Sequence, residues 1–444
     1  MVFVRILSFV LLSLAALSLP VAAAESCLTA GCHADYAGMA SPHPPVADEN
    51  CLYCHVQNRP EHPAAEGASF ELITQGAALC FLCHESMGGS EVHAPVVEGE
   101  CLSCHQVHGG DNPFLLAVGD DRSALCFECH DETPFTRSFR HGPVAVGACT
   151  SCHSPHASDH QALMKKPVRD SCLGCHDDFA GEMAAASFIH PPVQNALCTD
   201  CHDPHSSDFR FSLKQEMTDL CFACHPEIGE RAATAKVKHQ PMTQAGSCAD
   251  CHSTHFSQEH GLLSLPEQDL CLTCHGADSP LQDIEKQVSG EKNLHGPLRE
   301  GQCGDCHNPH GSDYYRLLKG SYPEGRYAPY REGTYDLCLG CHEENLLRFA
   351  DTTLYTNFRN GDLNLHFVHV ADVSKGRTCR LCHEPHASVG EKLINREGMP
   401  FGNWKVPIGF EATETGGSCA PGCHQEVRYD RESPVDNNFQ SFTE

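Results

Sequence analysis

A five-residue motif, Cys-x-x-Cys-His, recurs along the chain and constrains its fold more than any other feature of the sequence. Fifteen copies, thirteen of them with the two-residue gap, use all 30 cysteines of the 444-residue chain. Two thiols at this spacing can add across the vinyl groups of a haem, and the adjacent histidine can then bind the iron. We therefore predict covalent haem c at the cysteine pairs Cys27 and Cys32, Cys51 and Cys54, Cys80 and Cys83, Cys101 and Cys104, Cys126 and Cys129, Cys149 and Cys152, Cys172 and Cys175, Cys198 and Cys201, Cys221 and Cys224, Cys248 and Cys251, Cys271 and Cys274, Cys303 and Cys306, Cys338 and Cys341, Cys379 and Cys382, and Cys419 and Cys423.

The histidine after the second cysteine separates haem attachment from other uses of paired cysteines. Zinc ribbons, redox dithiols and disulfide frameworks also use Cys-x-x-Cys. Histidine fills only 32 of 444 positions, yet it follows the second cysteine in every copy, which a zinc or disulfide module has no reason to demand. The predicted proximal iron ligands are His33, His55, His84, His105, His130, His153, His176, His202, His225, His252, His275, His307, His342, His383 and His424.

The first and last copies of the motif have wider gaps, of four residues after Cys27 and three residues after Cys419. Wider gaps are less common for haem attachment. Their place at the ends of the series, and the lack of other cysteines with which they could pair, still favour haem at both. The prediction is therefore fifteen haem c groups, thirteen of them at regularly spaced motifs.

The composition leaves little material for a conventional hydrophobic core. Aromatic residues make up 7% of the chain, and glycine and proline number 36 and 28. Proline and glycine interrupt every segment between motifs, and few windows keep a helical period. We therefore predict a mostly irregular fold with short α-helices and almost no sheet, forming an elongated multihaem cytochrome of repeated two-haem units with the haems as its core.

Residues 1–24 have the pattern of a secretory signal peptide. Arg5 precedes an apolar run at 6–19, which is shorter than a typical membrane span, and three alanines stand before Glu25. The pattern predicts export to the periplasm, and it leaves association with the outer membrane or release outside the cell open. The predicted organisation is a signal peptide at 1–24, repeated two-haem units with haems 1–12 at 25–319, and a C-terminal region with longer insertions and haems 13–15 at 320–444.

An internal repeat organises the chain after the signal segment. Its first half reads Leu-Cys-x-x-Cys-His, and its second half begins with His-x-Pro and reaches Cys-x-x-Cys-His-x-x-His about eight residues later, as in His141 to His156. We call the two kinds of copy first-half and second-half motifs. The second-half motifs begin at residues 51, 101, 149, 198, 248, 303 and 379, so the period of 48 to 50 residues lengthens after about position 250.

The repeat also supplies a second set of histidines, which suits the sixth coordination position of haem iron. Most of these histidines either precede a second-half motif or follow its proximal histidine by three residues. For the fifteenth ligand His160, His260 and His366 compete, and we choose His366. Three extended residues span only about 10 Å, so the histidine after a motif is expected to serve a neighbouring haem. The predicted distal ligands are His43, His62, His93, His108, His141, His156, His190, His205, His239, His255, His295, His310, His366, His369 and His386.

The phrase from His141 to His156 resembles the repeat of the doubled-CXXCH multihaem c-type cytochromes of bacteria that respire metals or other extracellular acceptors. Members of that family include periplasmic electron carriers and decahaem cytochromes that sit inside outer-membrane porins; related extracellular cytochromes polymerise into haem filaments. The resemblance implies covalent haem c, two histidine ligands at each iron and an extended chain of haems. This sequence departs from it in its larger haem number, its two wider motifs and its longer C-terminal repeats.

A formal net charge of −28 argues against nucleic acid or an anionic membrane surface as a partner. The acidity favours solubility, and docking of basic partner cytochromes is the sharper alternative. The predicted function is non-enzymatic electron transfer to periplasmic or extracellular acceptors, with other redox proteins as donor and acceptor and with a porin or self-assembly as further possible partners. The alternatives are a multihaem reductase of nitrite, hydroxylamine or a sulfur oxyanion, and the protomer of a cytochrome filament. Reductases of this kind often bind one iron through Cys-x-x-Cys-Lys, which does not occur in this sequence.

Overall fold

The computed structural model describes residues 27–28, 32–118, 122–196, 198–244, 248–276, 283–396, 398–422 and 424–437. The predicted signal segment and Cys423 of the last motif lie outside these residues. The chain divides into two compact units. Unit one comprises Met1–Thr136 and His141–Pro167, and unit two comprises Arg137–Arg140 and Val168–Glu444. The predicted boundary at residue 320 falls inside unit two and stays a prediction.

The second half of most repeats starts with a two-residue strand, a histidine and a single helical turn. The histidine caps the turn, and in most copies a proline occupies one of the first two helical positions, where its missing N–H costs no helical hydrogen bond. The strands are β1 (Ser41–Pro42), β4 (Glu91–Val92), β6 (Phe139–Arg140), β8 (Phe188–Ile189) and β11 (Asn293–Leu294). The turns are α1 (Pro44–Ala47), α3 (Ala94–Val97), α5 (Gly142–Ala145), α8 (Pro191–Gln194), η9 (Gln240–Thr243) and α15 (Gly296–Arg299).

The cysteines of each second-half motif lie on another short turn. These turns are η2 (Cys51–Tyr53), η3 (Cys101–Ser103), η6 (Cys149–Ser151), α9 (Cys198–Cys201), α12 (Cys248–Cys251), η11 (Cys303–Asp305) and η13 (Cys379–Leu381). Most motifs continue into a second short strand, which is β5 (Gly109–Gly110), β7 (Ala157–Ser158), β9 (Ser206–Ser207), β10 (Phe256–Ser257) or β14 (Ala387–Ser388). A tight turn follows: η4 (Pro113–Leu115), η7 (Gln161–Leu163), η8 (Arg210–Ser212), η10 (His260–Leu262), η12 (Tyr315–Leu317) or η14 (Glu391–Leu393).

Pairing of these strands interlocks successive repeats. The strand that precedes one second-half motif pairs antiparallel with the strand that follows the second-half motif of the next repeat, as β1 does with β5 through Ser41 opposite Gly110. The other pairs of this kind are β4 with β7, β6 with β9, β8 with β10 and β11 with β14. At the corresponding place in the remaining repeat, a single bridge joins Val237 to Ser312. These pairings join each of the six repeats to its successor.

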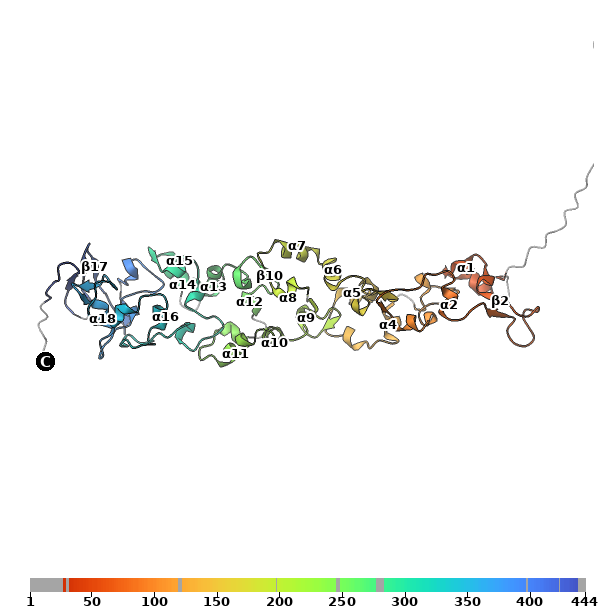
Figure 1. Ribbon diagram of the computed structural model, residues 1–444, viewed down its shortest axis with the longest axis horizontal. Helices are drawn as coiled ribbons and strands as arrows, with labels where there is room; N and C mark the ends of the chain where they lie inside the picture. Colours follow the sequence, from red (N-terminus) through yellow and green to blue (C-terminus); the bar gives the residue numbers. More distant parts are fainter. Residues whose placement is uncertain are drawn as a thin grey trace, which may run out of the picture. The chain divides into compact units, whose positions relative to one another are not determined.

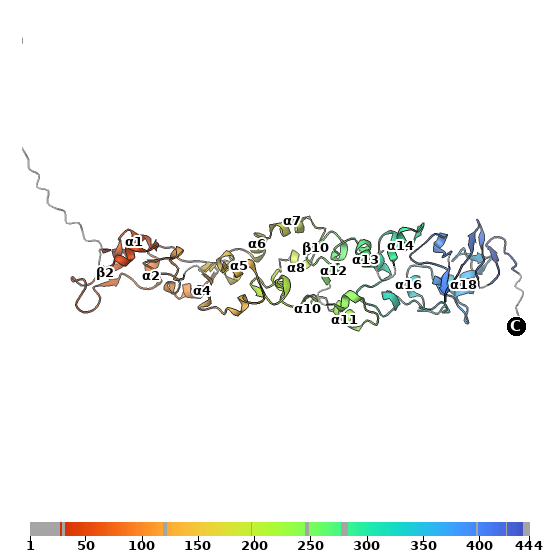
Figure 2. The same cartoon turned by 180° about the vertical axis from the view of Figure 1, so that it is seen from behind.

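The first-half motifs lie on or directly after slightly longer helices. These are α2 (Ala77–Cys80), α4 (Arg122–Phe127), α6 (Val168–Leu173), α10 (Met217–Phe222), α13 (Glu267–His275) and α16 (Asp336–Leu339). A second helix comes next in the chain after most of these motifs: η5 (Thr133–Phe135), α7 (Asp177–Ala185), α11 (Pro226–Thr234), α14 (Ile284–Ser289) or α17 (Asn345–Arg348). In unit two the described strands form only separate sheets of two or three strands, and no layered sheet lies between the helices of the described residues (Figures 1 and 2).

The C-terminal region differs from the repeats because it has a small apolar core. Tyr335 and Leu347 are buried there with Tyr322 and Val370. Short elements surround them: β12 (Arg359–Asn360), β13 (Leu363–Asn364) and α18 (Leu365–Val370), and beyond them the hairpin β15 (Met399–Phe401) with β16 (Trp404–Val406). A three-stranded sheet is formed by β17 (Phe410–Ala412), β18 (Gly416–Cys419) and β19 (Val427–Asp430), in that order.

The remaining elements lie at the start of unit one, where η1 (Ala34–Gly38) follows the first motif and β2 (His55–Gln57) pairs with β3 (Phe70–Leu72). The expectation of short helices and very little sheet is confirmed, because no described helix exceeds nine residues and no described sheet exceeds three strands. Among the described residues no helix combines the length and apolar character that a membrane crossing needs.

Candidate haem-binding sites

The repeats bring histidines together in facing pairs. Each measured pair joins one predicted proximal ligand to one predicted distal ligand, with ring centroids 5.8–6.4 Å apart. Nine of these pairs are nearly parallel, and two are tilted by 34–36°. The pairs are His33 with His62, His84 with His43, His55 with His108, His130 with His93, His105 with His156, His225 with His190, His202 with His255, His275 with His239, His252 with His310, His342 with His295 and His307 with His386.

The spacing of the rings fits one metal atom between them. Direct stacking of aromatic rings brings their centroids to about 4.5–7 Å with offset, so distance alone would not decide. A metal bound to an imidazole nitrogen on each side at about 2 Å separates those nitrogens by about 4 Å, and a ring radius at each end gives about 6 Å. Because a pair of cysteines precedes one histidine of every pair, the donor set fits haem c.

Two further histidine pairs come from a single helix in the C-terminal region. His366 and His369 are one turn apart on α18, so they project from one side of it. His366 lies close enough to His383 for electrostatic interaction, and His369 stands in the same relation to His424. One helix thus offers a second histidine to each of the last two motifs.

The second ring nitrogen of many proximal histidines is held by the backbone. After six second-half motifs, Nδ1 of the proximal histidine donates to the carbonyl oxygen nine residues later, at 2.8–2.9 Å. A carbonyl oxygen only accepts, so Nδ1 carries the hydrogen and Nε2 is left with a free lone pair. That tautomer is the one that can bind a metal through Nε2. The histidine and carbonyl pairs are His105 with Phe114, His153 with Ala162, His202 with Phe211, His252 with Gly261, His307 with Arg316, and His383 with Lys392.

In the sites of the first-half motifs, it is the distal histidine whose Nδ1 is hydrogen-bonded to a backbone carbonyl oxygen. Nδ1 of His93 lies 2.9 Å from the carbonyl oxygen of Pro155, and Nδ1 of His239 lies 3.1 Å from that of Pro309. The same interaction joins His43 to the backbone of Val107 and His190 to that of Thr254. First-half and second-half sites therefore each gain one imidazole fixed by a backbone carbonyl, but on opposite sides.

Burial keeps these imidazoles neutral, which is the form that binds a metal. It lowers the pKa of His366 and of His386 to about 4. A neighbouring imidazole adds to the effect, His383 in the first case and His307 in the second. Burial also lowers the pKa of His43, His108, His156, His190, His239, His255, His295, His307, His310, His369 and His383.

The thiols of neighbouring motifs also meet. The first cysteine of a first-half motif is hydrogen-bonded to the first cysteine of the second-half motif that follows it. These contacts are Cys80 with Cys101, Cys126 with Cys149, Cys221 with Cys248, Cys271 with Cys303 and Cys338 with Cys379; Cys27 of the wide first motif meets Cys51 in the same way. All described cysteines are free of disulfide bonds. The hydrogen bond with Cys248, together with burial, raises the pKa of Cys221.

The opposite junction, from a second-half motif to the next first-half motif, is made by the distal histidines. The backbone N–H of His43 donates to the carbonyl oxygen of His108 at 3.1 Å, although these two rings face different partners. The same bond joins His93 to His156, His190 to His255 and His295 to His386. Cysteine contacts and distal-histidine contacts therefore alternate along the series of sites within each unit.

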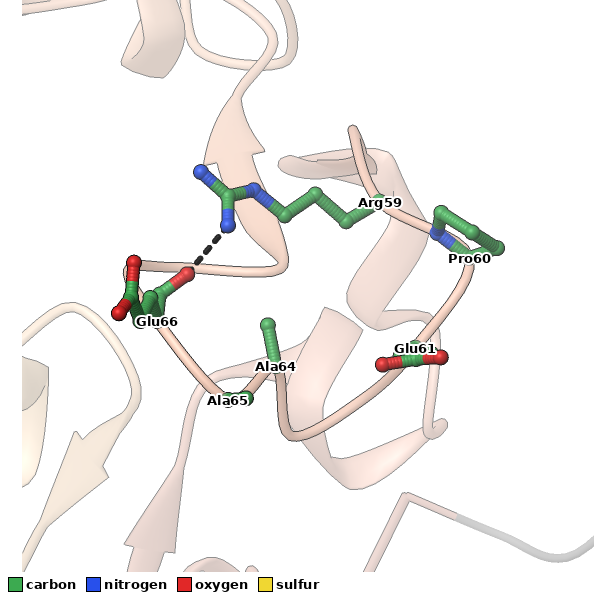
Figure 3. Close-up of a pocket in the computed structure, with 6 residues that line it drawn as sticks. All are labelled: Arg59, Pro60, Glu61, Ala64, Ala65 and Glu66. Carbon is green, nitrogen blue, oxygen red and sulfur yellow. Dashed lines mark hydrogen bonds between the residues drawn. The ribbon is translucent and has the colours of Figure 1, made fainter.

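His62 reaches the first motif from the loop between β2 and β3. Ser69 accepts a hydrogen bond from the N–H of Ala64 at 2.9 Å, and the Arg59 guanidinium donates to the carbonyl oxygen of Glu66. Figure 3 shows the pocket that this loop encloses, lined by Arg59, Pro60, Glu61, Ala64, Ala65 and Glu66. None of the predicted ligands lines it. The loop therefore serves to present His62, whose ring packs edge-on against Phe70 and faces His33.

Most of the predicted site residues are thus brought together. His141, His153, His176 and His205 also have interaction partners. His160 and His260 are not among the measured facing pairs; His260 packs edge-on against Phe188. Sequence reasoning missed a serine five residues after the proximal histidine, at Ser158, Ser207, Ser257, Ser312 and Ser388. The internal repeat contains that signal, because the phrase His-x-x-His-x-Ser recurs at the same offset.

Paired cysteines, an adjacent histidine and a second facing histidine, repeated along the chain, define a multihaem c-type cytochrome. Six segments match the model of the doubled CXXCH motif, at residues 43–89, 93–135, 141–181, 190–230, 239–280 and 295–346. Together they cover more than half of the chain, which therefore belongs to this family. Each segment starts at a predicted distal histidine and contains two motifs, so the six account for up to about twelve haem c groups. No curated protein matches the chain.

Proposed function

We propose that the protein is a non-enzymatic electron carrier that binds fifteen haem c groups, each between two histidines. A protein of this class exchanges electrons with other redox proteins. Bound haem iron alternates between two oxidation states and so takes up and releases one electron at a time. The polypeptide binds the haems, orders them and fills both axial positions.

The observation that carries the proposal is the alternation of contacts between sites. In the site of Cys80, where His43 faces His84, Cys80 touches Cys101 of the following site. In the preceding site His108 faces His55, and the backbone of His43 is hydrogen-bonded to that of His108. Within each unit, contacts of these two kinds join most neighbouring sites of the regular repeats. A carrier needs that continuity, since an electron must pass between neighbouring centres, whereas an enzyme needs only one reactive centre.

The second support is the filling of both coordination positions. A haem that reduces a substrate needs an open position on the iron, while a carrier does not. The facing pairs supply a second histidine on the far side from the proximal one, including His62 for the wide first motif. Histidine rather than methionine as the second ligand also favours low reduction potentials, since methionine raises them.

The third support is the lack of apolar burial in the repeats. Leu52, Tyr53 and Leu102, which lie inside the motifs, are 61–66% exposed. Covalent porphyrins between the facing histidines would cover such side chains and supply the missing apolar volume. The haems would then form the core of each repeat.

The two wide motifs belong to the array in this proposal. Cys27 contacts Cys51 as the regular motifs contact each other, and His33 faces His62 at 6.0 Å. At the other end His424 lies near His369. We further propose that the protein is exported, and that it acts in respiration with a periplasmic or extracellular acceptor. The signal-like pattern at 1–24 and the resemblance to carriers of that kind support this location.

The test combines haem quantitation with optical and magnetic spectroscopy of the purified holoprotein. The proposal expects fifteen low-spin haems per chain. Thirteen would remove the wide motifs from the array. A high-spin haem that binds nitrite or hydroxylamine would contradict the carrier and favour the reductase.

A pair of variants makes the ligand assignment specific. His62→Ala should convert one low-spin haem to high spin, because the iron at the first motif loses its second ligand. His260→Ala is the matched control, since His260 is exposed and packs only edge-on against Phe188. An unchanged spectrum in His62→Ala would contradict the assignment of His62.

A further inference from the structure

A left-handed turn of unusual composition follows six of the seven second-half motifs. Its two central residues have φ of 54–69°, at Phe114 and Leu115, Ala162 and Leu163, Phe211 and Ser212, Gly261 and Leu262, Arg316 and Leu317, and Lys392 and Leu393. Eleven of these twelve residues are not glycine. A left-handed conformation costs such residues about 1–2 kcal/mol each. Repetition of this cost at one offset indicates that the turn has a task.

The backbone carbonyl groups of the turn indicate what it does. Its first left-handed residue carries the carbonyl oxygen that accepts the hydrogen from Nδ1 of the proximal histidine. Its second carries the carbonyl oxygen that accepts from the N–H of the residue after that histidine, as Ser212 does from Asp203 at 2.7 Å. One turn thus holds both the ring and the backbone of the proximal ligand.

A serine five residues after the proximal histidine closes this turn. Ser207 accepts from the N–H of Phe209 at 2.9 Å and donates to the carbonyl oxygen of Leu213, so its hydroxyl spans the turn from start to end. Ser158, Ser257, Ser312 and Ser388 make the same two bonds. Ser207 is 2% exposed, so its hydrogen bonds are protected from water.

The motif at Cys101 lacks the serine, so it tests whether closure of the turn is what matters. Gly110 stands where the other turns have serine, and a Cβ on it would require the flexible side chain of Gln106 to move. There the amide of Asn112 donates to the carbonyl oxygen of Leu116 at 3.2 Å, and the turn still presents Phe114 to His105. A different donor closes the same end of the same turn.

We propose that the serine-closed left-handed turn is the positioning element that sets the orientation and donor strength of the proximal imidazole in the second-half sites. Ser207 and its counterparts are positioning residues, because they act through the turn and not on the iron. The proposal rests on the proposed function, which supplies the haem. A hydrogen bond from Nδ1 makes the imidazole a stronger donor, which stabilises oxidised iron and lowers the reduction potential.

The experiment compares Phe211→Val with Phe211→Gly in the full-length holoprotein. Both variants remove the 69% exposed ring and its contact with Arg210, and they differ in the β-branched side chain and in what the backbone tolerates. Glycine accepts φ of 59° without strain, and a β-branched valine does not. Phe211→Gly should keep the wild-type potentials. Phe211→Val should shift the oxidised-to-reduced ratio of one haem by up to about tenfold toward reduction, which is about 59 mV for one electron.

Ser207→Ala and Ser206→Ala form a second pair, which decides the matter where Phe211→Val does not mature. Both serines are buried side by side, but only Ser207 closes the turn. The readouts are haem content, the low-spin magnetic signal of each haem and potentiometric titration. One altered low-spin signal with raised potential in Ser207→Ala alone supports the proposal. Equal potentials and signals in Ser207→Ala and Ser206→Ala, at full haem content, would overturn it. Fewer haems or a high-spin haem in the wild-type protein would instead count against the proposed function.

Discussion

The repeats and the C-terminal region are stabilised in opposite ways. In the repeats, pairs of two-residue strands and carbonyl-fixed histidines join the segments, and few apolar side chains are buried. After residue 320 a tyrosine-rich cluster, a hairpin and a three-stranded sheet are present. The buried apolar side chains of the described residues are Met183 and Ala235 in the repeats, and Tyr322, Tyr335, Leu347, Val370, Ala387, Ile408 and Tyr429 in the C-terminal region.

Under the proposal that haems fill the repeats, this difference separates the segments whose folding would depend on the cofactor from the region where the polypeptide contributes a core of its own. Ordering a residue costs about 1–2 kcal/mol of backbone entropy, and a hydrogen bond returns about 1 kcal/mol net. Strand pairs of two residues do not balance that cost. Burial of Tyr335 and Leu347, at 0% and 2% exposure, is the kind of gain that does.

The largest expected effect is that of withholding haem from the full-length chain. Amide hydrogens of β1, β5, β8 and β10 should exchange at the rate of an unfolded chain, because the repeats lose their core. Amides around Tyr335 should exchange more slowly than those of the repeats. Hydrogen exchange read by mass spectrometry measures both in one sample. Equal protection of the repeats with and without haem would break the comparison.

The next effect is on the apolar cluster itself. Tyr335→Ala should cost about 3–5 kcal/mol of C-terminal stability, because it removes a buried ring. Tyr335→Phe keeps the ring and loses the hydrogen bond that the hydroxyl donates to the carbonyl oxygen of Ala328, so it should cost about 1 kcal/mol. Local exchange rates or denaturant titration measure both. Val373→Ala is the control, since Val373 is 91% exposed, and a comparable loss there would contradict the role of burial.

A third effect is a pH dependence of the C-terminal ligands. In the chain without haem, burial places the pKa of His366 and His386 at about 4 in the folded state, compared with about 6.5 in the unfolded state. Between these values the unfolded chain binds more protons, so stability rises with pH. It should therefore fall as the pH drops from about 6.5 through about 4, by about 3 kcal/mol for each group at about 1.4 kcal/mol per unit.

Denaturant titrations of the haem-free chain at each pH, followed through the C-terminal region, measure this loss. His260→Gln is the control, because His260 is exposed and belongs to none of the measured pairs. Its pH profile should match that of the wild type. A stability that stays constant from pH 6.5 to pH 4 would show that the burial of these two imidazoles has no energetic consequence.

The smallest effect concerns the cap of α18. The Asn364 side chain accepts from the N–H groups of His366 and Phe367 and donates to the carbonyl oxygen of Leu346 at 2.8 Å. Asn364→Ala should cost about 1–2 kcal/mol and disturb the low-spin signals of the last two haems together. Asp283→Ala removes the cap of α14, which carries no predicted ligand, and should leave all haem signals intact. Signals that respond equally in both variants would remove the special role of α18.

The sequence predicted the motifs, the second set of histidines and the shortness of the elements, because each depends on residue type at a fixed offset. The left-handed turn could not be predicted in this way. The atom that accepts the hydrogen bond from the histidine is a backbone carbonyl oxygen. The residues that carry it, such as Phe114, Ala162 and Lys392, have no side-chain property in common. The serine that closes the turn recurs in the sequence repeat, but its structural role could not be predicted without the turn that it closes.

The partner of each histidine could not be read from the sequence either. Strands that pair, such as those of Ser41 and Gly110, are separated in the sequence by more than the length of one repeat. Partners in space are therefore not neighbours along the chain. The C-terminal sheet was missed because β18 begins with Gly416 and Gly417, which are poor strand formers. Tertiary pairing with β17 and β19 overrides that preference.

If the chain is exported as proposed above, with its N-terminus leaving the cytoplasm first, the interlocking of repeats sets an order in time. When His84 emerges, its partner His43 is already outside, so that site can be completed at once. His55 must wait for His108, and His105 must wait for His156, which each belong to the repeat still to come. During such an export every second site would therefore stay incomplete until the next stretch of chain arrives, and haem attachment and ligation would advance along the protein one repeat behind its export.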